Sequence, residues 1–372
     1  MQGRGRFRVN IAKQLRPVLA RTKRRYYTWR LSQIARQQVV TLSPRPGAGL
    51  DEATRQEALT FLGSLVRGYR DLRWHEAYSR ANTHPSAYYM PDDIFYALAM
   101  PALNPKDRTA ILGDKNHFDR IEGWPPLPAT VGRLMNGRLL DPHFGPATIA
   151  ELIRQLPPGS QLVVKPSRVT GAGKGVAFVE AGSLAEALIG RTDAIIQLPV
   201  AQHRDLSVLN ANSLNTLRIT TYRKLDGEVV HLGSLLRMGR TGSRVDNASA
   251  GGVFCGVDGE RGVLKADAFE KNAVKTYQAH PDNGLFFAGR KVPGFAVVRD
   301  AFVAAHRRTP WIDIASWDAA IDAAGQPVTI EVNVGNTISI PQLACGPVFE
   351  PVADDLRRRI GSRRYSGLAG FL

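Results

Sequence analysis

The sequence predicts an α+β fold in which antiparallel hairpins dominate. Short apolar runs of strand length alternate with helical stretches from about residue 111 onward. Two pairs of such runs meet at turn-forming residues, around Asp226-Gly227 and around Gly325, as is typical of hairpins. A glycine-rich stretch within QLVVKPSRVTGAGKGVAFVE (161–180) separates two more short runs. A doubly wound sheet is built from parallel strands with helices between them and lacks such hairpins, so we expect a mixed α+β chain.

The chain has 372 residues, which is enough for a sizeable core and more than one domain. Its net charge of +16 is concentrated at the start, where residues 1–50 contain twelve Lys or Arg and no Asp or Glu. The rest of the chain has the other 37 of the 49 basic residues and all 33 acidic residues. We therefore expect a basic tail attached to a nearly balanced globular body.

The tail segment RTKRRYYTWR (21–30) mixes cations with aromatic side chains. Such a segment suits an anionic membrane surface, which we favour; nucleic acid and no dedicated partner are the alternatives. No apolar stretch of signal-peptide or membrane-spanning length is present. The two cysteines, Cys255 and Cys345, lack metal-ligand spacing. We expect a cytoplasmic protein with reduced thiols, membrane-peripheral if the tail binds lipid.

The elements follow in order along the chain. SPRPGAG (43–49) reads as a linker, apolar residues at helical spacing predict a helix over 51–70, and a second helical stretch is expected through 92–100. The later strands that we expect are LVVKP, GVAFVE, AIIQLPV, TLRITTYR, EVVHLGSLLRM, SWDAAID and PVTIEVNVG. The domains that we expect are a tail (1–45), a helical leading region (46–110), two α+β subdomains (111–196 and 197–350) and a C-terminal helix or tail (351–372).

The glycine-rich stretch fits neither common phosphate-binding fingerprint. A Walker A loop would need glycine at Arg168 and Ser or Thr at Gly175, and a Rossmann fingerprint would open a helix rather than a strand. What remains is a flap between antiparallel strands whose backbone N–H groups close over phosphates. The flap glycines are Gly171, Gly173 and Gly175, and Lys165 at the end of the incoming strand can reach the same phosphates. A surface hairpin with an exposed lysine is the alternative.

The stretch HRDLSVLN (203–210) matches the catalytic-loop pattern of protein kinases. Only 27 residues separate Gly175 from His203, too few for the lysine strand, helices and hinge that a kinase places there, and no D-F-G follows. We interpret the match as coincidence.

A second signal is WIDIASWDAAIDAAGQPVTIEVNVGN (311–336). Side chains alternate along a strand, so Glu331 and Asn333 share one face. A hairpin centred near Ala324-Gly325 would place Asp318 opposite Glu331. Two carboxylates and an amide oxygen are ligands that suit Mg²⁺, whereas Zn²⁺ would need Cys or His. The alternative is a wet polar strand face.

In TLRITTYR, Leu217 and Ile219 face one way and Arg218 the other. An arginine on the polar face of an active-site strand can stabilise a transferring phosphoryl group or an acyl-phosphate. Arg237, on the partner strand, is a second candidate. Both could instead be surface cations in ion pairs.

Together these motifs, in this order and spacing, resemble the ATP-grasp superfamily and its sugar-transfer-associated branch, a relative of glutamate-ligase-like enzymes. The resemblance runs from about 111 to 345 and implies an ATP-grasp fold of two α+β subdomains that clasp ATP. ILGDKNHFDRIEGWPPLPAT resembles the segment that supplies a first ATP lysine, here Lys115, and Lys165 corresponds to the second. DAIIQLPVAQH resembles the strand that edges the adenine pocket, with Gln197 where many relatives have Glu and Val200 close by.

NSLNTLRITTYR and RMGRTGSRVDNASAGGVF resemble the branch's own signature. We expect Asn247, Gly251 and Gly252 to shape the substrate loop. WDAAID…TIEVN resembles the paired metal motif. This resemblance implies that Asp318, Glu331 and Asn333 are ligands of Mg²⁺.

The resemblance implies an ATP- and Mg²⁺-dependent ligase that joins a carboxylate to an amine through an acyl-phosphate, in the setting of cell-surface polysaccharide. The expected partners are therefore a small-molecule or sugar-linked carboxylate and an amine. A phosphotransferase acting on a hydroxyl, and a non-catalytic nucleotide-binding or nucleic-acid-binding protein, are the alternatives.

Overall fold

The computed structural model describes residues 49–168, 175–240, 242, 251–271, 275–335 and 338–361. It divides the chain into two compact units: residues 1–102 with 352–372, and Leu103–Pro351. The basic tail lies outside the described residues. Within the described part, no helix is long and apolar enough to cross a membrane.

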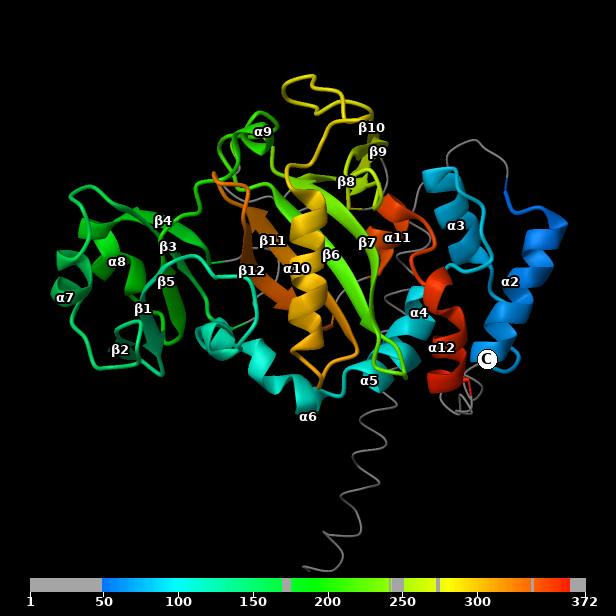
Figure 1. Ribbon diagram of the computed structural model, residues 1–372, viewed down its shortest axis with the longest axis horizontal. Coiled ribbons are helices and arrows are strands. Elements are labelled where there is room, and N and C mark those ends of the chain that lie inside the picture. Colours follow the sequence, from blue (N-terminus) through cyan, green and yellow to red (C-terminus); the bar gives the residue numbers. More distant parts are fainter. Residues whose placement is uncertain are drawn as a thin grey trace, which may run out of the picture. The chain divides into compact units, whose positions relative to one another are not determined.

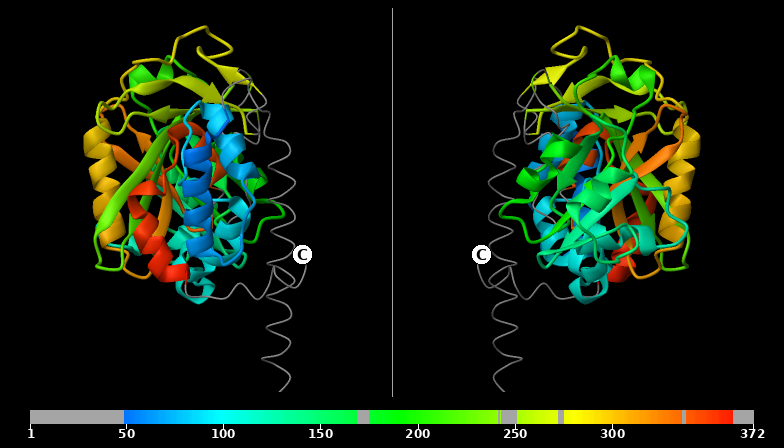
Figure 2. Two further views of the ribbon diagram at one scale, coloured as in Figure 1. Left: turned by 90° about the vertical axis from the view of Figure 1, so that its right-hand side faces the viewer. Right: turned by 90° about the vertical axis from the view of Figure 1, so that its left-hand side faces the viewer.

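The first unit is helical. Helices α2 (Glu52–Leu65) and α3 (Arg73–Asn82) lie side by side (Figure 2) and are linked by Arg55 Nη2 and Glu76 Oε1 at 3.0 Å. The helix predicted over 51–70 is confirmed but ends at Leu65, because Val66 adopts an extended conformation. Asp51 caps its start by accepting a hydrogen bond from the Thr54 amide at 2.7 Å.

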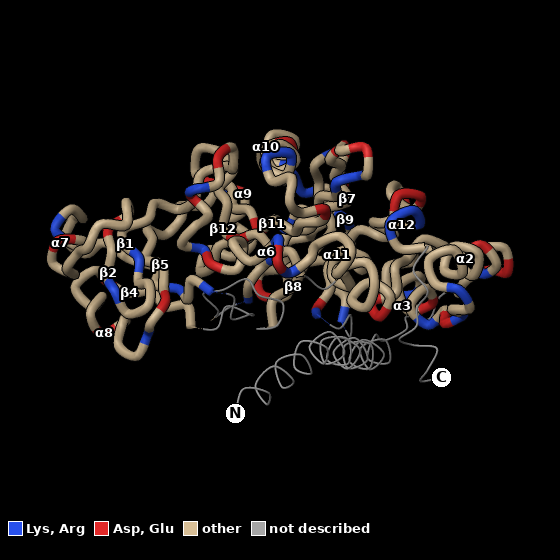
Figure 3. The backbone as a smooth tube through the Cα atoms, turned by 90° about the horizontal axis from the view of Figure 1, so that it is seen from below, with Lys and Arg blue, Asp and Glu red and all other residues tan. Residues whose placement is uncertain are grey.

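The stretch predicted as helical through 92–100 consists of three short successive helical segments. They are α4 (Asp92–Ile94), the π-helical turn η1 (Phe95–Ala99) and α5 (Met100–Leu103). Near the C-terminus, η6 (Glu350–Val352) leads into α12 (Ala353–Ile360). This last helix has aspartates in its first turn and arginines in its last turn (Figure 3), an order that the helix dipole favours.

The second unit begins with helical turns and a five-stranded antiparallel sheet. The turns are α6 (Lys106–Thr109), η2 (Ala110–Gly113) and η3 (Lys115–Arg120). The strands are β1 (Thr130–Met135), β2 (Arg138–Leu140), β3 (Gln161–Lys165), β4 (Ala177–Glu180) and β5 (Ala194–Gln197), in the order β2-β1-β5-β3-β4. The helices between them are α7 (Ile149–Arg154), η4 (Ala181–Ser183) and α8 (Leu184–Leu188). As predicted, β3 and β4 are antiparallel on either side of the glycine-rich stretch.

The larger sheet has seven antiparallel strands in the order β10-β9-β8-β7-β6-β11-β12. They are β6 (Thr216–Arg223), β7 (Val229–Met238), β8 (Val253–Val257), β9 (Leu264–Phe269), β10 (Thr276–Tyr277), β11 (Ile314–Ile321) and β12 (Pro327–Asn333). Both predicted hairpins are confirmed, because β6 pairs with β7 and β11 with β12. Their turns contain Gly227 and Gly325 with φ of 92° and 81°, which glycine adopts without strain. The α+β class is therefore confirmed.

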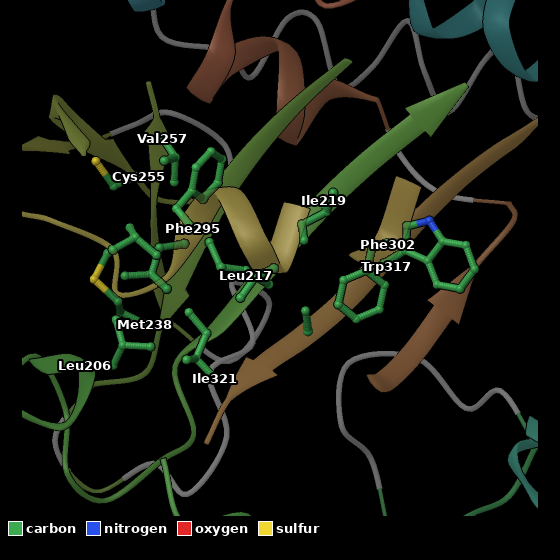
Figure 4. Close-up of a cluster of buried hydrophobic side chains, with 14 of the residues drawn as sticks. Leu206, Leu217, Ile219, Met238, Cys255, Val257, Phe295, Phe302, Trp317 and Ile321 are labelled. Carbon is green, nitrogen blue, oxygen red and sulfur yellow. The ribbon is translucent and has the colours of Figure 1, made fainter. Parts of the chain in front are cut away.

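Helix α10 (Phe295–Arg307) crosses one face of the seven-stranded sheet (Figure 1). The core between them takes Leu217 and Ile219 from β6, Phe302 from α10 and Trp317 from β11 (Figure 4). The predicted apolar face of β6 is thus the core face. Burial of the indole is completed by a 2.9 Å hydrogen bond from Trp317 Nε1 to Thr221 Oγ1.

Helix α11 (Ser339–Cys345) packs so closely on β7 and β8 that glycine is required beneath it. A Cβ on Gly256 would lie 2.1 Å from the carbonyl oxygen of Ala344. We expect Gly256→Ala to lower the free energy of unfolding by about 3 kcal/mol, because the backbone of α11 must move. Gly182→Ala is the control, since nothing lies within 4 Å of a Cβ there. Equal urea midpoints for the two variants would contradict this packing.

Candidate active site

The turn η3 carries Lys115 to the end of β3. The Lys115 amide donates to the Ser167 carbonyl at 2.8 Å, and Asp114 forms an isolated β-bridge with Arg168. Asp114 also caps the turn, accepting from the Asn116 amide at 3.0 Å. Lys115 Nζ reaches Glu331 Oε1 on β12 of the other sheet at 2.7 Å. The turn η3, which is bonded to the chain just after β3, therefore meets the seven-stranded sheet at a lysine–glutamate pair.

Residues after η3 strengthen this junction. Thr329, two positions before Glu331, donates from its amide to the Pro126 carbonyl and from its hydroxyl to the Pro125 carbonyl, both at 2.8 Å. Because both groups of Thr329 are buried and paired, these two hydrogen bonds, and not the ion pair alone, set the position of β12 relative to the lysine-bearing segment.

A fully buried arginine, which the sequence analysis did not identify, supports η3. Arg133 of β1 donates to the Asn116 carbonyl at 2.6 Å and pairs with the carboxylate of Asp119. Its guanidinium also lies 4.4 Å from the centre of the Phe144 ring. An arginine within the otherwise apolar strand TVGRLM was the available signal, since a buried cation needs dedicated partners.

Lys165 ends β3, as predicted, and lies within electrostatic reach of Lys115 and Glu331. Burial and, next, the charge of Lys115 lower the pKa of its ammonium to about 8, while Glu331 opposes the shift. Two lysines held this close repel each other unless an anion lies between or beside them. Their arrangement suits a polyphosphate.

The second cluster centres on Asp318 of β11. The register places Asp318 opposite Glu331 on β12, which confirms the predicted alignment, and opposite Arg218 on β6. Arg218 donates from Nε and Nη2 to the two carboxylate oxygens, both at 2.9 Å. Arg237 Nη1 reaches Oδ2 at 2.8 Å, and Asn333 Nδ2 reaches the same oxygen at 3.3 Å.

This cluster is electrostatically strong. The Asp318 carboxyl is buried, which alone would raise its pKa, but the charges and hydrogen bonds of Arg218 and Arg237 lower its pKa to about 2. Across both clusters four cationic side chains face two carboxylates. The net positive charge attracts an anion.

Gln197 ends β5 and is buried. Its Nε2 donates to the Pro128 carbonyl at 3.1 Å, while Oε1 has no partner among the described residues. Val200 follows in the half-buried segment after the strand.

The predicted loop glycines are described only in part. Gly171, Gly173 and Asn247 lie outside the described residues. Gly175 has φ of +80°, and a Cβ there would meet Pro166 Cγ at 2.9 Å, so the turn position two residues before β4 requires glycine. Gly251, with φ of 88°, and Gly252 lead into β8.

The kinase-like stretch forms the short helix α9 (Arg204–Ser207) and a loop that accepts hydrogen bonds from a side-chain amide. Asn215, at the entry to β6, donates to the carbonyls of Leu206 and Asn210 at 3.0 and 2.9 Å, and to Gln202 Oε1 at 3.0 Å. Its role is to tie this loop to the strand that carries Arg218.

The HPDNG turn (280–284) makes a similar connection. His280 contacts the Gly239 carbonyl at 3.2 Å, and Asn283 Nδ2 donates to the carbonyls of Val208 and Leu209 at 2.9 and 2.8 Å. The turn therefore links the end of β7 to the loop after α9.

The donor chemistry fits a divalent cation in part. Glu331 and Asn333 offer hard oxygen ligands two positions apart on β12, as Mg²⁺ prefers. Among the described residues, no three His, Cys, Asp or Glu side chains lie close enough together to hold a metal ion. The candidate metal ligands are therefore the carboxylates of Glu331 and Asp318 and the amide of Asn333. Asp318, the third predicted ligand, is bonded to two arginines and one amide.

Among solved structures, the chain is similar to carboxylases and ligases at low identity. The biotin carboxylase domain of 2-oxoglutarate carboxylase from Hydrogenobacter thermophilus is 14% identical with a TM-score of 0.40, over 69% of this chain and 47% of that chain. VanG D-Ala:D-Ser ligase from Enterococcus faecalis is 12% identical with a TM-score of 0.41, over 68% and 62%. The matches span less than two thirds of each of these structures. A comparison with curated proteins found no match.

A comparison with family models found a match to the family described as Sugar-transfer associated ATP-grasp, over residues 183–358. The matched region includes Arg218, Arg237 and the hairpin of Asp318 and Glu331, and it begins after both lysine segments. The resemblance drawn from the sequence is thereby confirmed: the chain resembles the ATP-grasp superfamily, and residues 183–358 match its sugar-transfer associated branch.

Proposed function

We propose that this protein is an ATP- and Mg²⁺-dependent ligase that joins a carboxylate to an amine. The observation that carries the proposal is the junction of the two sheets. There a lysine-bearing turn meets Glu331, next to a carboxylate held by two arginines. Its net positive charge suits a triphosphate, and its hard oxygens suit the accompanying magnesium.

In this proposal the substrate carboxylate attacks the γ-phosphorus of ATP, and ADP leaves. The amine nitrogen then attacks the acyl carbon, phosphate leaves, and the nitrogen loses a proton. Lys115 and Lys165 hold the phosphates, and Arg218 and Arg237 hold the anionic acyl-phosphate. Bound magnesium would neutralise phosphate charge, held by Glu331 and Asn333 beside Asp318. No protein nucleophile is required, because positioning and charge supply the catalysis.

The family match to a sugar-transfer associated branch supports a sugar-linked acid, such as a uronic acid in cell-surface polysaccharide, as the carboxylate. We extend the proposal to an anionic membrane surface bound by the basic tail (1–45), whose charge suits lipid headgroups. Deleting the tail is expected to abolish sedimentation with anionic vesicles and to leave turnover unchanged. Unchanged sedimentation would refute the membrane role alone.

The test is an ADP-release screen with uronic acids, amino acids and short peptides, each paired with candidate amines. A ligase is expected to form a hydroxamate when hydroxylamine replaces the amine. Glu331→Gln should reduce turnover at least about 100-fold, whereas Glu228→Gln, at an exposed lysine–glutamate pair in the β6–β7 turn, should not. A stable phosphorylated product would indicate a phosphotransferase, and no ATP turnover with any substrate would indicate nucleotide binding only.

A further inference from the structure

The carboxylate of Asp318, which we expected to be a metal ligand, already accepts hydrogen bonds at both of its oxygens. Four N–H groups point at its two oxygens: two from Arg218 at 2.9 Å, one from Arg237 at 2.8 Å and one from Asn333 at 3.3 Å. A carboxylate offers about four lone-pair positions. A cation bound to Asp318 would therefore displace at least one of these donors.

The cost of that displacement would fall on the arginines. The side chains of Arg218 and Arg237 are only 13% and 11% exposed, and a buried cation without its counter-charge is strongly unfavourable. Glu331 differs in both respects: its side chain is 24% exposed, and Lys115 is its partner among the described residues. Of the two carboxylates, Glu331 can accept a metal more easily.

The strands explain why both arginines reach one carboxylate. Arg218 lies directly opposite Asp318 in the β6–β11 register, and Arg237 lies diagonally beyond it on β7, opposite Thr216. Two guanidinium groups this close repel each other, and one carboxylate bonded to both removes the repulsion and sets their orientation. The result is a fixed pair of cations beside Glu331 and Asn333.

We infer that Asp318 is a positioning residue that holds Arg218 and Arg237 as an anion-binding pair, and that the protein's ligands for the divalent cation are Glu331 and Asn333 without Asp318. The inference rests on the proposed function, since the anion is the carboxylate or acyl-phosphate of that reaction. It assigns the acid-binding role to β6, β7 and β11, and the metal-binding role to β12.

The first test is binding of Mn²⁺ in the presence of ADP, followed by the electron paramagnetic resonance signal of free Mn²⁺. Asp318→Asn keeps the shape of the side chain, and we expect its Mn²⁺ affinity to stay within about threefold of the unchanged protein. Glu331→Gln is expected to weaken Mn²⁺ binding at least tenfold. An equal loss in the two variants would overturn the inference.

A second variant keeps the inference testable if Asp318→Asn does not fold. Arg237→Lys keeps the positive charge near the site but loses the guanidinium bond to Asp318, and it leaves both carboxylates in place. If Asp318 serves the arginines, the Mn²⁺ affinity of this variant stays the same; if Asp318 is a metal ligand, the released oxygen binds Mn²⁺ more tightly. Tighter binding would overturn the inference.

With an acid from the screen, turnover gives an independent measure. We expect Asp318→Asn to raise the KM for the acid and lower kcat at least tenfold, with the half-saturating Mg²⁺ concentration unchanged. A raised Mg²⁺ requirement would contradict the positioning role. Failure of the unchanged protein to bind Mn²⁺ with ADP would instead refute the proposed function, so the two failures are distinguishable.

Discussion

Replacing Arg218 by methionine is expected to lower kcat by about 10²–10³-fold. Arg218 makes a two-pronged contact with Asp318 and lies on the polar face of β6. In the proposed reaction, its charge stabilises the acyl-phosphate and the transferring phosphoryl group. Arg218→Lys should recover only part of the rate, because an ammonium keeps the charge but loses the planar two-pronged geometry. Steady-state ADP release with the acid identified by the screen measures both variants.

Arg223 provides the control on the same strand. It donates to the carbonyls of His306, Ile312 and Thr309 near the end of α10, away from the two clusters. Arg223→Met is therefore expected to lower the melting temperature while leaving kcat nearly unchanged. Equal kcat losses in the Arg218 and Arg223 variants would show that the first reports stability rather than catalysis.

Lys165 is expected to make nucleotide binding strongly dependent on pH. Burial, and then the charge of Lys115, lower the pKa of Lys165 to about 8 against the opposing effect of Glu331, so the ammonium is lost as the pH rises through that value. Affinity for ADP should therefore fall by up to tenfold per pH unit above pH 8, until the pKa of the complex is reached. Lys165→Met should bind ADP about 100-fold more weakly and lose this dependence.

The effect on stability has the opposite sign. The folded-state pKa of Lys165 lies below its ordinary value of 10.5, so between about pH 8 and 10.5 the unfolded chain binds more protons than the folded one. The contribution of Lys165 to the free energy of unfolding thus rises with pH over that range while ADP affinity falls. Calorimetric titrations with ADP at several pH values measure the affinity, and urea unfolding at the same pH values measures the free energy of unfolding. Lys291→Met, at an exposed lysine, is the control. A flat affinity profile would contradict a phosphate-binding ammonium.

Local features of the fold could be predicted because their causes lie close together in the chain. The Asp226-Gly227 and Gly325 turns, the alternation that buries Leu217 and Ile219, and the register that places Asp318 opposite Glu331 all depend on neighbouring residues. The helix predicted over 51–70 was too long at its C-terminal end, where the extended conformation of Val66 ends α2 at Leu65.

Contacts between distant strands could not be predicted in the same way. Arg218 and Asp318 are 100 positions apart, and Arg133 supports η3 from a strand that follows it. Nothing local specifies such pairs, because they form only once sheet order and register bring the strands together. The sequence does indicate that such a pair must exist, because an arginine in an apolar strand, such as Arg133, needs a partner when it is buried.

The α+β class, the hairpins and the charged residues of the two clusters thus follow from the order of amino acids. How those charged residues pair depends on the packing of the two sheets. Lys115 meets Glu331 because η3 is bonded to the end of β3, and both arginines meet Asp318 because β6 lies between β7 and β11. The physical reason is that charges act through space, and only the sheets set their distances.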